Sequence, residues 1–253
     1  AANIPDVYVL AMVTVSADTP VVDSKKLGTA TTISKDELSK IPTSREPWAL
    51  MRTLPGVLVD RVNLAGSESG QQSAFLTKGA DAKDAVWMLD GIVITDQVSM
   101  ASPSYFNYDT FDEINFSTGG SDITQSAGGM GIGLVSKRGT NAFHANASGY
   151  FTHDDLQSSN LPDELVGDPR LQGGDKADHT EQISDYSFDL GGPIVKDKLW
   201  FYGGYGKNDI RIKRLTQTRD KTLLSNYNAK LNWQASSKDM VSAFWFLGAK
   251  TKI

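Results

Sequence analysis

The sequence predicts an α+β domain followed by the start of a transmembrane antiparallel β-barrel, and three observations carry this prediction. Segments before residue 140 are short and mixed, whereas later ones lengthen and alternate apolar and polar residues with period two. The connections between the later segments alternate between long and short, as the loops and turns of membrane barrels do. In 191–202 (GGPIVKDKLWFY), a short polar turn leads directly into an aromatic run, which suits a lipid boundary.

The first part is expected to contain two short helices and several short strands. Residues 31–42 predict a strand and a helical turn. A second helix is predicted within 42–57, because Ser44 precedes it, Pro47 lies in its first turn and Pro55-Gly56 ends it. One face of this helix collects Pro47, Leu50, Met51 and Leu54. Strands are expected at 57–62, 74–79, 85–91, 92–96, 111–118 and 131–139, with polar loops at 63–73 and 97–109.

The second part is expected to contain about five longer strands with one apolar and one polar face. They are predicted at 141–151, 183–190, 199–206, 227–234 and 241–248. A soluble β-sandwich would also alternate, but the loop lengths favour the barrel. Single-chain membrane barrels have at least about eight strands, and open strand edges are not tolerated in lipid. We therefore expect the barrel to continue outside this sequence.

Composition narrows the functional classes. The net charge of −5 and pI near 5.2 argue against nucleic acid as a partner. The chain has no cysteine, so disulfides and thiolate metal sites are excluded. No apolar run approaches the roughly 20 residues of a membrane helix. Because the sequence starts AANIPDVYVL, without an initiator Met or a cleavable signal, we expect a mature or partial product.

No motif predicts catalysis. The stretch GSESG at 66–70 has Glu68 where a nucleophile elbow needs Ser, and GGMGIG at 128–133 lacks dinucleotide-binding spacing. The three histidines show no zinc spacing. Acidic residues in 153–180 could bind calcium, although irregular spacing favours a solvated loop. We expect no enzyme activity, cofactor or metal site.

Several ordered motifs resemble one family. IPTSREPWALMRTLPGVLVDRV, VWMLDGIVITD, the stretch from FDEINFSTGGSD to KRGTNAFHANASGYF, and GGPIVKDKLWFY together resemble the plug and first barrel strands of TonB-dependent outer-membrane transporters, specifically the Oar-like group. Ala145 departs from the glycine usual in that group. The resemblance implies an extended segment at 1–20, a plug at 21–140, and at 141–253 the first strands of a 22-stranded barrel in a Gram-negative outer membrane.

The resemblance also implies import of an unidentified ligand, driven by the inner-membrane protein TonB. The β-branched stretch MVTVSA, without glycine, suits a strand that adds to a partner's sheet. We therefore expect TonB to contact Met12, Val13, Thr14, Val15, Ser16 and Ala17. An ordinary edge strand or a linker from an upstream domain is the alternative.

The two long polar loops of the first part are the expected floor of a ligand site, with a peptide or protein favoured as ligand. Amide and aromatic contacts are expected from Gln71, Gln72, Tyr105, Phe106 and Tyr108. Alternatively, these loops only pack against the barrel wall. The rival functions are a structural or adhesive outer-membrane barrel without transport, and a soluble enzyme or lectin-like sandwich.

Overall fold

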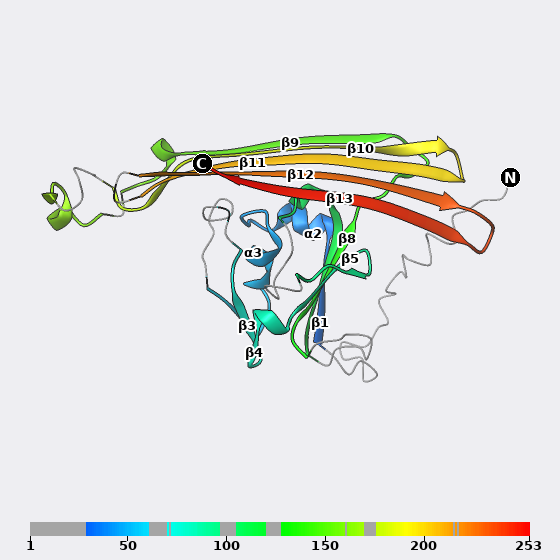
Figure 1. Cartoon of the computed structure of the whole chain (residues 1–253), viewed down its shortest axis with the longest axis horizontal. Coiled ribbons are helices and arrows are strands. Elements are labelled where there is room, and N and C mark those ends of the chain that lie inside the picture. Colours follow the sequence, from blue (N-terminus) through cyan, green and yellow to red (C-terminus); the bar gives the residue numbers. More distant parts are fainter. Residues whose placement is uncertain are drawn as a thin grey trace.

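The computed structural model describes residues 29–60, 70, 72–96, 105–119, 128–159, 161–169, 176–214, 216 and 218–253. The expected TonB-contacting stretch, Met12 to Ala17, and Gln71 lie outside these residues. Figure 1 shows long strands lying side by side across a more compact N-terminal region (29–136). A linker (137–143) joins the two parts.

Two small sheets and two short helices build the N-terminal region. The larger sheet has the order β1-β7-β8-β5-β6 and is antiparallel except for the parallel pair β5–β8. Its strands are β1 (Thr29–Ser34), β5 (Val86–Leu89), β6 (Ile92–Val93), β7 (Phe111–Gly119) and β8 (Gly131–Ser136). The smaller sheet contains β2 (Val57–Val59), β3 (Phe75–Thr77) and β4 (Ala80–Asp81), and the helices are α2 (Lys35–Lys40) and α3 (Pro47–Met51).

The predicted second helix forms, with a later start and an earlier end than expected. Glu46, not Ser44, is the N-cap of α3, and Pro47 occupies its first turn, where a missing N–H costs nothing. The predicted apolar face is confirmed, because Pro47, Leu50, Met51 and Leu54 are all buried. These side chains share a core with aromatic residues, including the neighbouring rings of Trp48 of α3 and Trp87 of β5.

The later strands form one open antiparallel sheet in chain order, called the wall below. Its strands are β9 (His144–His153), β10 (His179–Val195), β11 (Leu199–Lys213), β12 (Arg219–Gln234) and β13 (Met240–Lys252). The short turns 196–198 and 235–239 lie at one end of the wall and the longer connections at the other (Figure 1). Three strands are much longer than predicted, because cross-strand pairing continues through glycine and charged residues that break the sequence pattern.

The two faces of the wall differ as predicted. On the face away from the N-terminal region, Phe188, Trp233 and Trp245 are half exposed or more. On the opposite face, Asp189, Asn226 and Asn232 are buried beneath the N-terminal region. The β-sandwich alternative is wrong, because the polar face of this sheet packs on the N-terminal region and no second sheet of described residues packs on its apolar face. Within the described residues, no helix is long and apolar enough to cross a membrane.

Candidate functional site at the contact between the N-terminal region and the wall

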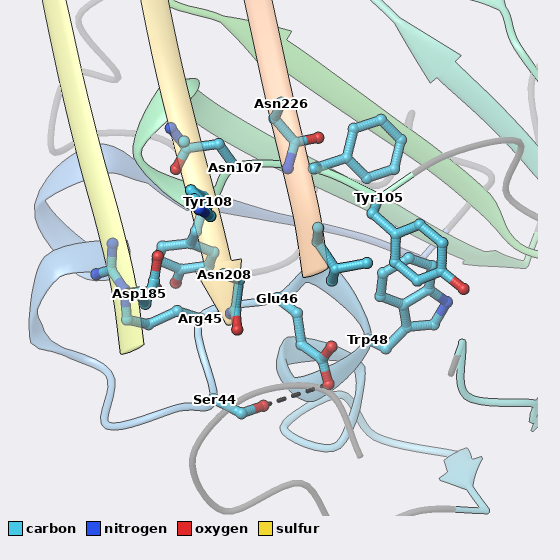
Figure 2. Close-up of a pocket in the computed structure, with 14 residues that line it drawn as sticks. Ser44, Arg45, Glu46, Trp48, Tyr105, Asn107, Tyr108, Asp185, Asn208 and Asn226 are labelled. Atoms are coloured by element: carbon cyan, nitrogen blue, oxygen red, sulfur yellow. Dashed lines mark hydrogen bonds and ion pairs between the residues drawn. The ribbon is translucent and has the colours of Figure 1, made fainter. Parts of the chain in front are cut away.

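Arg45 lies at the centre of the first group of contacts with the wall. Its guanidinium pairs with Asp109 at 2.5 Å and with Asp185 of β10 at 3.1 Å. It also stacks over the ring of Tyr150 of β9, 3.9 Å from the centroid. Arg45 adopts φ +58°, a conformation uncommon for a residue with a side chain. Contacts from two strands of the wall thus hold this backbone conformation in place. Figure 2 shows Arg45 beside Asp185 of β10.

The charge on Asp109 is stabilised by this arrangement. Burial by itself would raise the pKa of Asp109, but hydrogen bonds donated by Arg45 and by Ser148 of β9 outweigh it and lower the pKa. Ser148 Oγ lies 2.5 Å from the same carboxylate oxygen. A loop carboxylate and a loop cation therefore both depend on the wall for their partners.

Lys137 makes a second, more deeply buried ion pair. Its Nζ lies 2.9 Å from Asp189 Oδ2 of β10, and their side chains are only 8% and 1% exposed. The second carboxylate oxygen accepts a hydrogen bond from Asn146 of β9 at 2.9 Å. Lys230 of β12 forms a third pair, 3.0 Å from Asp90. Ion pairs thus join the N-terminal region and the linker to both halves of the wall.

Close approach of the two parts is possible because glycines face inward. A Cβ on Gly206 of β11 would lie 2.6 Å from Asn107 Cγ. Asn107 instead reaches across and donates a hydrogen bond to Ser187 of β10 at 2.9 Å. Figure 2 shows Asn107 beside Asn226 and Asn208, whose strands border the same pocket. The cavity here is about 30 Å³, and a second cavity of about 190 Å³, which shares Tyr108 as a lining residue, lies between the N-terminal region and β9 and β10.

The two predicted ligand-facing loops meet at Lys250 of β13. Its Nζ donates to the carbonyl oxygen of Gly70 at 2.8 Å and to the hydroxyl of Tyr105 at 3.1 Å. A Cβ on Gly70 would approach Thr222 Cγ2 of β12 to 2.5 Å, so this loop end is also packed on the wall. One lysine therefore joins the ends of two loops that lie 35 residues apart in the sequence.

The expected ligand-facing residues occupy different environments. Gln72 and Tyr105 are partly exposed. Phe106 belongs to the core and stacks on Trp87, with ring centroids 6.3 Å apart. Tyr108 is also buried, and its hydroxyl donates to the carbonyl of Leu38 at 3.2 Å. Gln72 and Tyr105 are therefore accessible at the surface of the described part, whereas Phe106 and Tyr108 are not.

Metal-ligating side chains do not gather in the described part of the chain: no three His, Asp or Glu residues there lie close enough to hold an ion. In the acidic connection after β9, Asp154 pairs with Lys176 at 2.5 Å. That lysine, assisted by the nearby histidines, lowers the pKa of Asp154. The carboxylate is thus already neutralised by a cation of the protein.

Comparison with known proteins agrees with this architecture. Residues 23–133 match the model of the TonB-dependent Receptor Plug Domain, and residues 135–222 match that of an outer membrane beta barrel domain. Together the two matches give this chain the plug, formed by its N-terminal region, and part of the barrel of TonB-dependent outer-membrane receptors. These domains place the protein in the outer membrane of a Gram-negative bacterium.

The most informative relatives are longer than this chain. The TonB-dependent transporter Oar of Myxococcus xanthus is 27% identical over 142 residues, which cover 53% of this chain and 12% of Oar. The outer membrane transporter YddB of Escherichia coli superimposes with a TM-score of 0.69 at 14% identity, over 88% of this chain and 33% of YddB. The siderophore receptor PirA of Acinetobacter baumannii gives a TM-score of 0.62 at 17% identity, over 88% of this chain and 31% of PirA.

The sequence analysis missed the charged residues that join plug and wall. Arg45, Lys137 and Lys250 had no motif that marked them as wall contacts. Asp185 and Asp189 were recognised only as members of a polar face. One signal was available in the sequence. Asp185 and Asp189 are four residues apart, so both side chains point to the same side of a strand, and two carboxylates buried there need cations opposite them.

Proposed function

We propose that this receptor imports a ligand actively, with the plug closing the barrel until TonB acts on the N-terminal segment. Ion pairs and close glycine contacts that hold the plug against β10, β11 and β12 support this function. Import along this wall then requires the plug to move. The match to the TonB-dependent Receptor Plug Domain supports the assignment of TonB as partner, and we infer that the receptor has no enzyme activity.

The ligand site is proposed at the two plug loops joined by Lys250. The observation that carries this assignment is the pair of hydrogen bonds from Lys250 to Gly70 and Tyr105. Gly70 of the loop 63–73 and Tyr105 of the loop 97–109 thus contact the same residue of the wall, near the end of β13 opposite the short turns (Figure 1). Tyr105 and Gln72 are the proposed direct contacts, together with Gln71 of the same loop.

A peptide or protein fragment is the proposed ligand class, because amide and aromatic side chains suit a peptide backbone and its side chains. An iron-loaded siderophore is the competing class, since PirA of Acinetobacter baumannii is a siderophore receptor. Mass spectrometry of material that co-purifies with the full-length receptor separates the two. Tyr105→Ala should weaken binding of the identified ligand while leaving barrel assembly intact; unchanged binding would remove Tyr105 from the site.

Energy coupling is proposed to run through Met12 to Ala17 by strand addition to TonB. Val13→Pro or Val15→Pro deletes an N–H from the proposed ladder, so import should be lost while ligand binding at the cell surface stays normal. Ala2→Pro, outside the stretch, is the matched control. Import at the parental rate in both proline variants would show that coupling lies elsewhere. Absence of import of the identified ligand by the parent would favour a structural or adhesive barrel.

A further inference from the structure

The linker between plug and wall is fastened to the wall at three successive places. The first is the buried pair of Lys137 with Asp189. Next, a Cβ on Gly139 would overlap the carbonyl oxygen of Phe201 in β11, so only glycine lets the linker lie this close to the strand. At the third place, Asn141 Oδ1 accepts hydrogen bonds from Asp197 N at 3.0 Å and from Trp200 Nε1 at 2.7 Å.

The third contact uses both ends of the Asn141 side chain. Asn141 Nδ2 also donates to Asp197 Oδ1 at 2.6 Å. Asp197 lies in the short turn between β10 and β11 with φ +61°, which holds its backbone N–H toward the linker. The two family-like motifs KRGTN and GGPIVKDKLW are therefore binding partners in the fold: the first is the linker and the second is the turn that holds it.

The opposite end of the plug is held much less firmly. Among the described residues, β1 is an edge strand of its sheet and pairs with β7 alone, over the register from Thr29 to Ser34. Four of its six residues are exposed, and Ile33 is its one buried side chain. Edge strands with few buried contacts open at low free-energy cost. The first described strand of the plug is thus its weak end, and the linker is its firmly held end.

We propose that Lys137, Gly139 and Asn141 form a linker clamp, the fixed point against which the plug is rearranged. This inference rests on the proposed function for the origin of the force at the N-terminus. With the clamp closed, force applied there removes β1 first while β8 stays at the wall. The plug then returns to the same register when the force ends.

The clamp can be tested in the full-length receptor without any ligand. Two buried residues serve as reporters, Ile33→Cys on β1 and Leu134→Cys on β8, in outer membranes titrated with urea and labelled with a membrane-impermeant maleimide. The Ile33 reporter should become labelled at lower urea than the Leu134 reporter. Equal midpoints in the parent would overturn the proposal, since neither end would then be the firmer.

Lys137→Met should lower the urea midpoint for labelling the Leu134 reporter until it is close to that of the Ile33 reporter, because Asp189 is left buried without its cation. The matched control is Arg45→Met, which removes a plug cation from Asp185, four residues earlier on the same face of β10. In the control variant, the urea midpoints of the two reporters should stay well apart. The clamp would be no more than an ordinary stabilising contact if Lys137→Met lowered both midpoints equally, or if Arg45→Met made the two midpoints equal.

A disulfide between Asn141→Cys and Asp197→Cys tests whether the clamp stays closed during energy coupling. Labelling of the Ile33 reporter is compared in energised cells with and without TonB. TonB-dependent labelling that persists after the disulfide forms supports the clamp, whereas labelling that is lost and returns on reduction overturns it. Labelling that never depends on TonB counts against the proposed function, and the urea titration then still decides the clamp.

Discussion

The plug contacts the wall along two seams of opposite chemistry. The polar seam joins Arg45 and Lys137 to Asp185 and Asp189 of β10. The apolar seam lies on β13, where Phe244 and Phe246 pack against the plug core, with Phe246 and Phe106 at 5.5 Å between ring centroids. A buried ion pair requires both partners in place, whereas an apolar contact tolerates any side chain of similar volume. The polar seam therefore fixes the position of the plug, and the apolar seam adds affinity.

The largest effect is expected from breaking the polar seam at its most buried point. Asp189→Asn keeps the shape of the side chain but leaves the Lys137 ammonium buried without a counter-charge. Removing one partner of a buried pair costs about 3–5 kcal/mol. The urea midpoint for labelling the Leu134 reporter should fall accordingly.

The double variant Lys137→Met with Asp189→Leu is the control for that prediction. It replaces the ion pair by apolar side chains and should recover most of the lost stability. A double variant as unstable as Asp189→Asn alone would show that the contact depends on shape and not on charge.

A smaller effect is expected at the apolar seam. Phe246→Ala should destabilise the contact between plug and wall by about 2 kcal/mol. The cost is lower than the roughly 3–5 kcal/mol typical of a fully buried phenylalanine, because Phe246 is only partly buried. Phe246→Leu should cost under about 1.5 kcal/mol. The same urea titration measures both. A leucine variant as unstable as the alanine variant would contradict the difference between the seams.

The smallest effect is expected from acid at the Arg45 contact. The pKa of Asp109 in the folded receptor lies below its ordinary value of 3.8. Its charge therefore stabilises the seated plug above that pH, and the contribution is lost as the pH falls through the folded-state pKa. Labelling of the Ile33 reporter, here with 4,4′-dithiodipyridine because this disulfide reacts with thiols in acid, should rise below about pH 4. The Asp109→Asn variant, which cannot titrate there, should lack this step; an identical acid profile in both proteins would assign the loss to other groups.

Pattern and spacing predicted most of the local structure. The alternation of 227–234 placed Leu231 and Trp233 on one face and Asn232 and Gln234 on the other, as found. The spacing of Leu50, Met51 and Leu54 gave the buried face of α3. Strand ends were predicted less well, because backbone pairing in β11 and β12 extends through segments with no clear alternation. The candidate ligand loops were predicted as segments, but the burial of Phe106 and Tyr108 depends on which loop residue reaches the core.

The sequence by itself determined the two-part architecture, the polar and apolar faces of the wall, and the resemblance to one transporter family. The first two features follow from periodicity and composition, which act over a few residues, and the resemblance follows from ordered motifs. Only the tertiary structure decided that Arg45 lies between two aspartates, that Lys250 joins two loops, and that the linker motif binds the turn motif 56 residues later. Each of these contacts joins residues far apart in the chain. The packing of the plug against the wall brings them within hydrogen-bonding distance, and no local pattern encodes that distance.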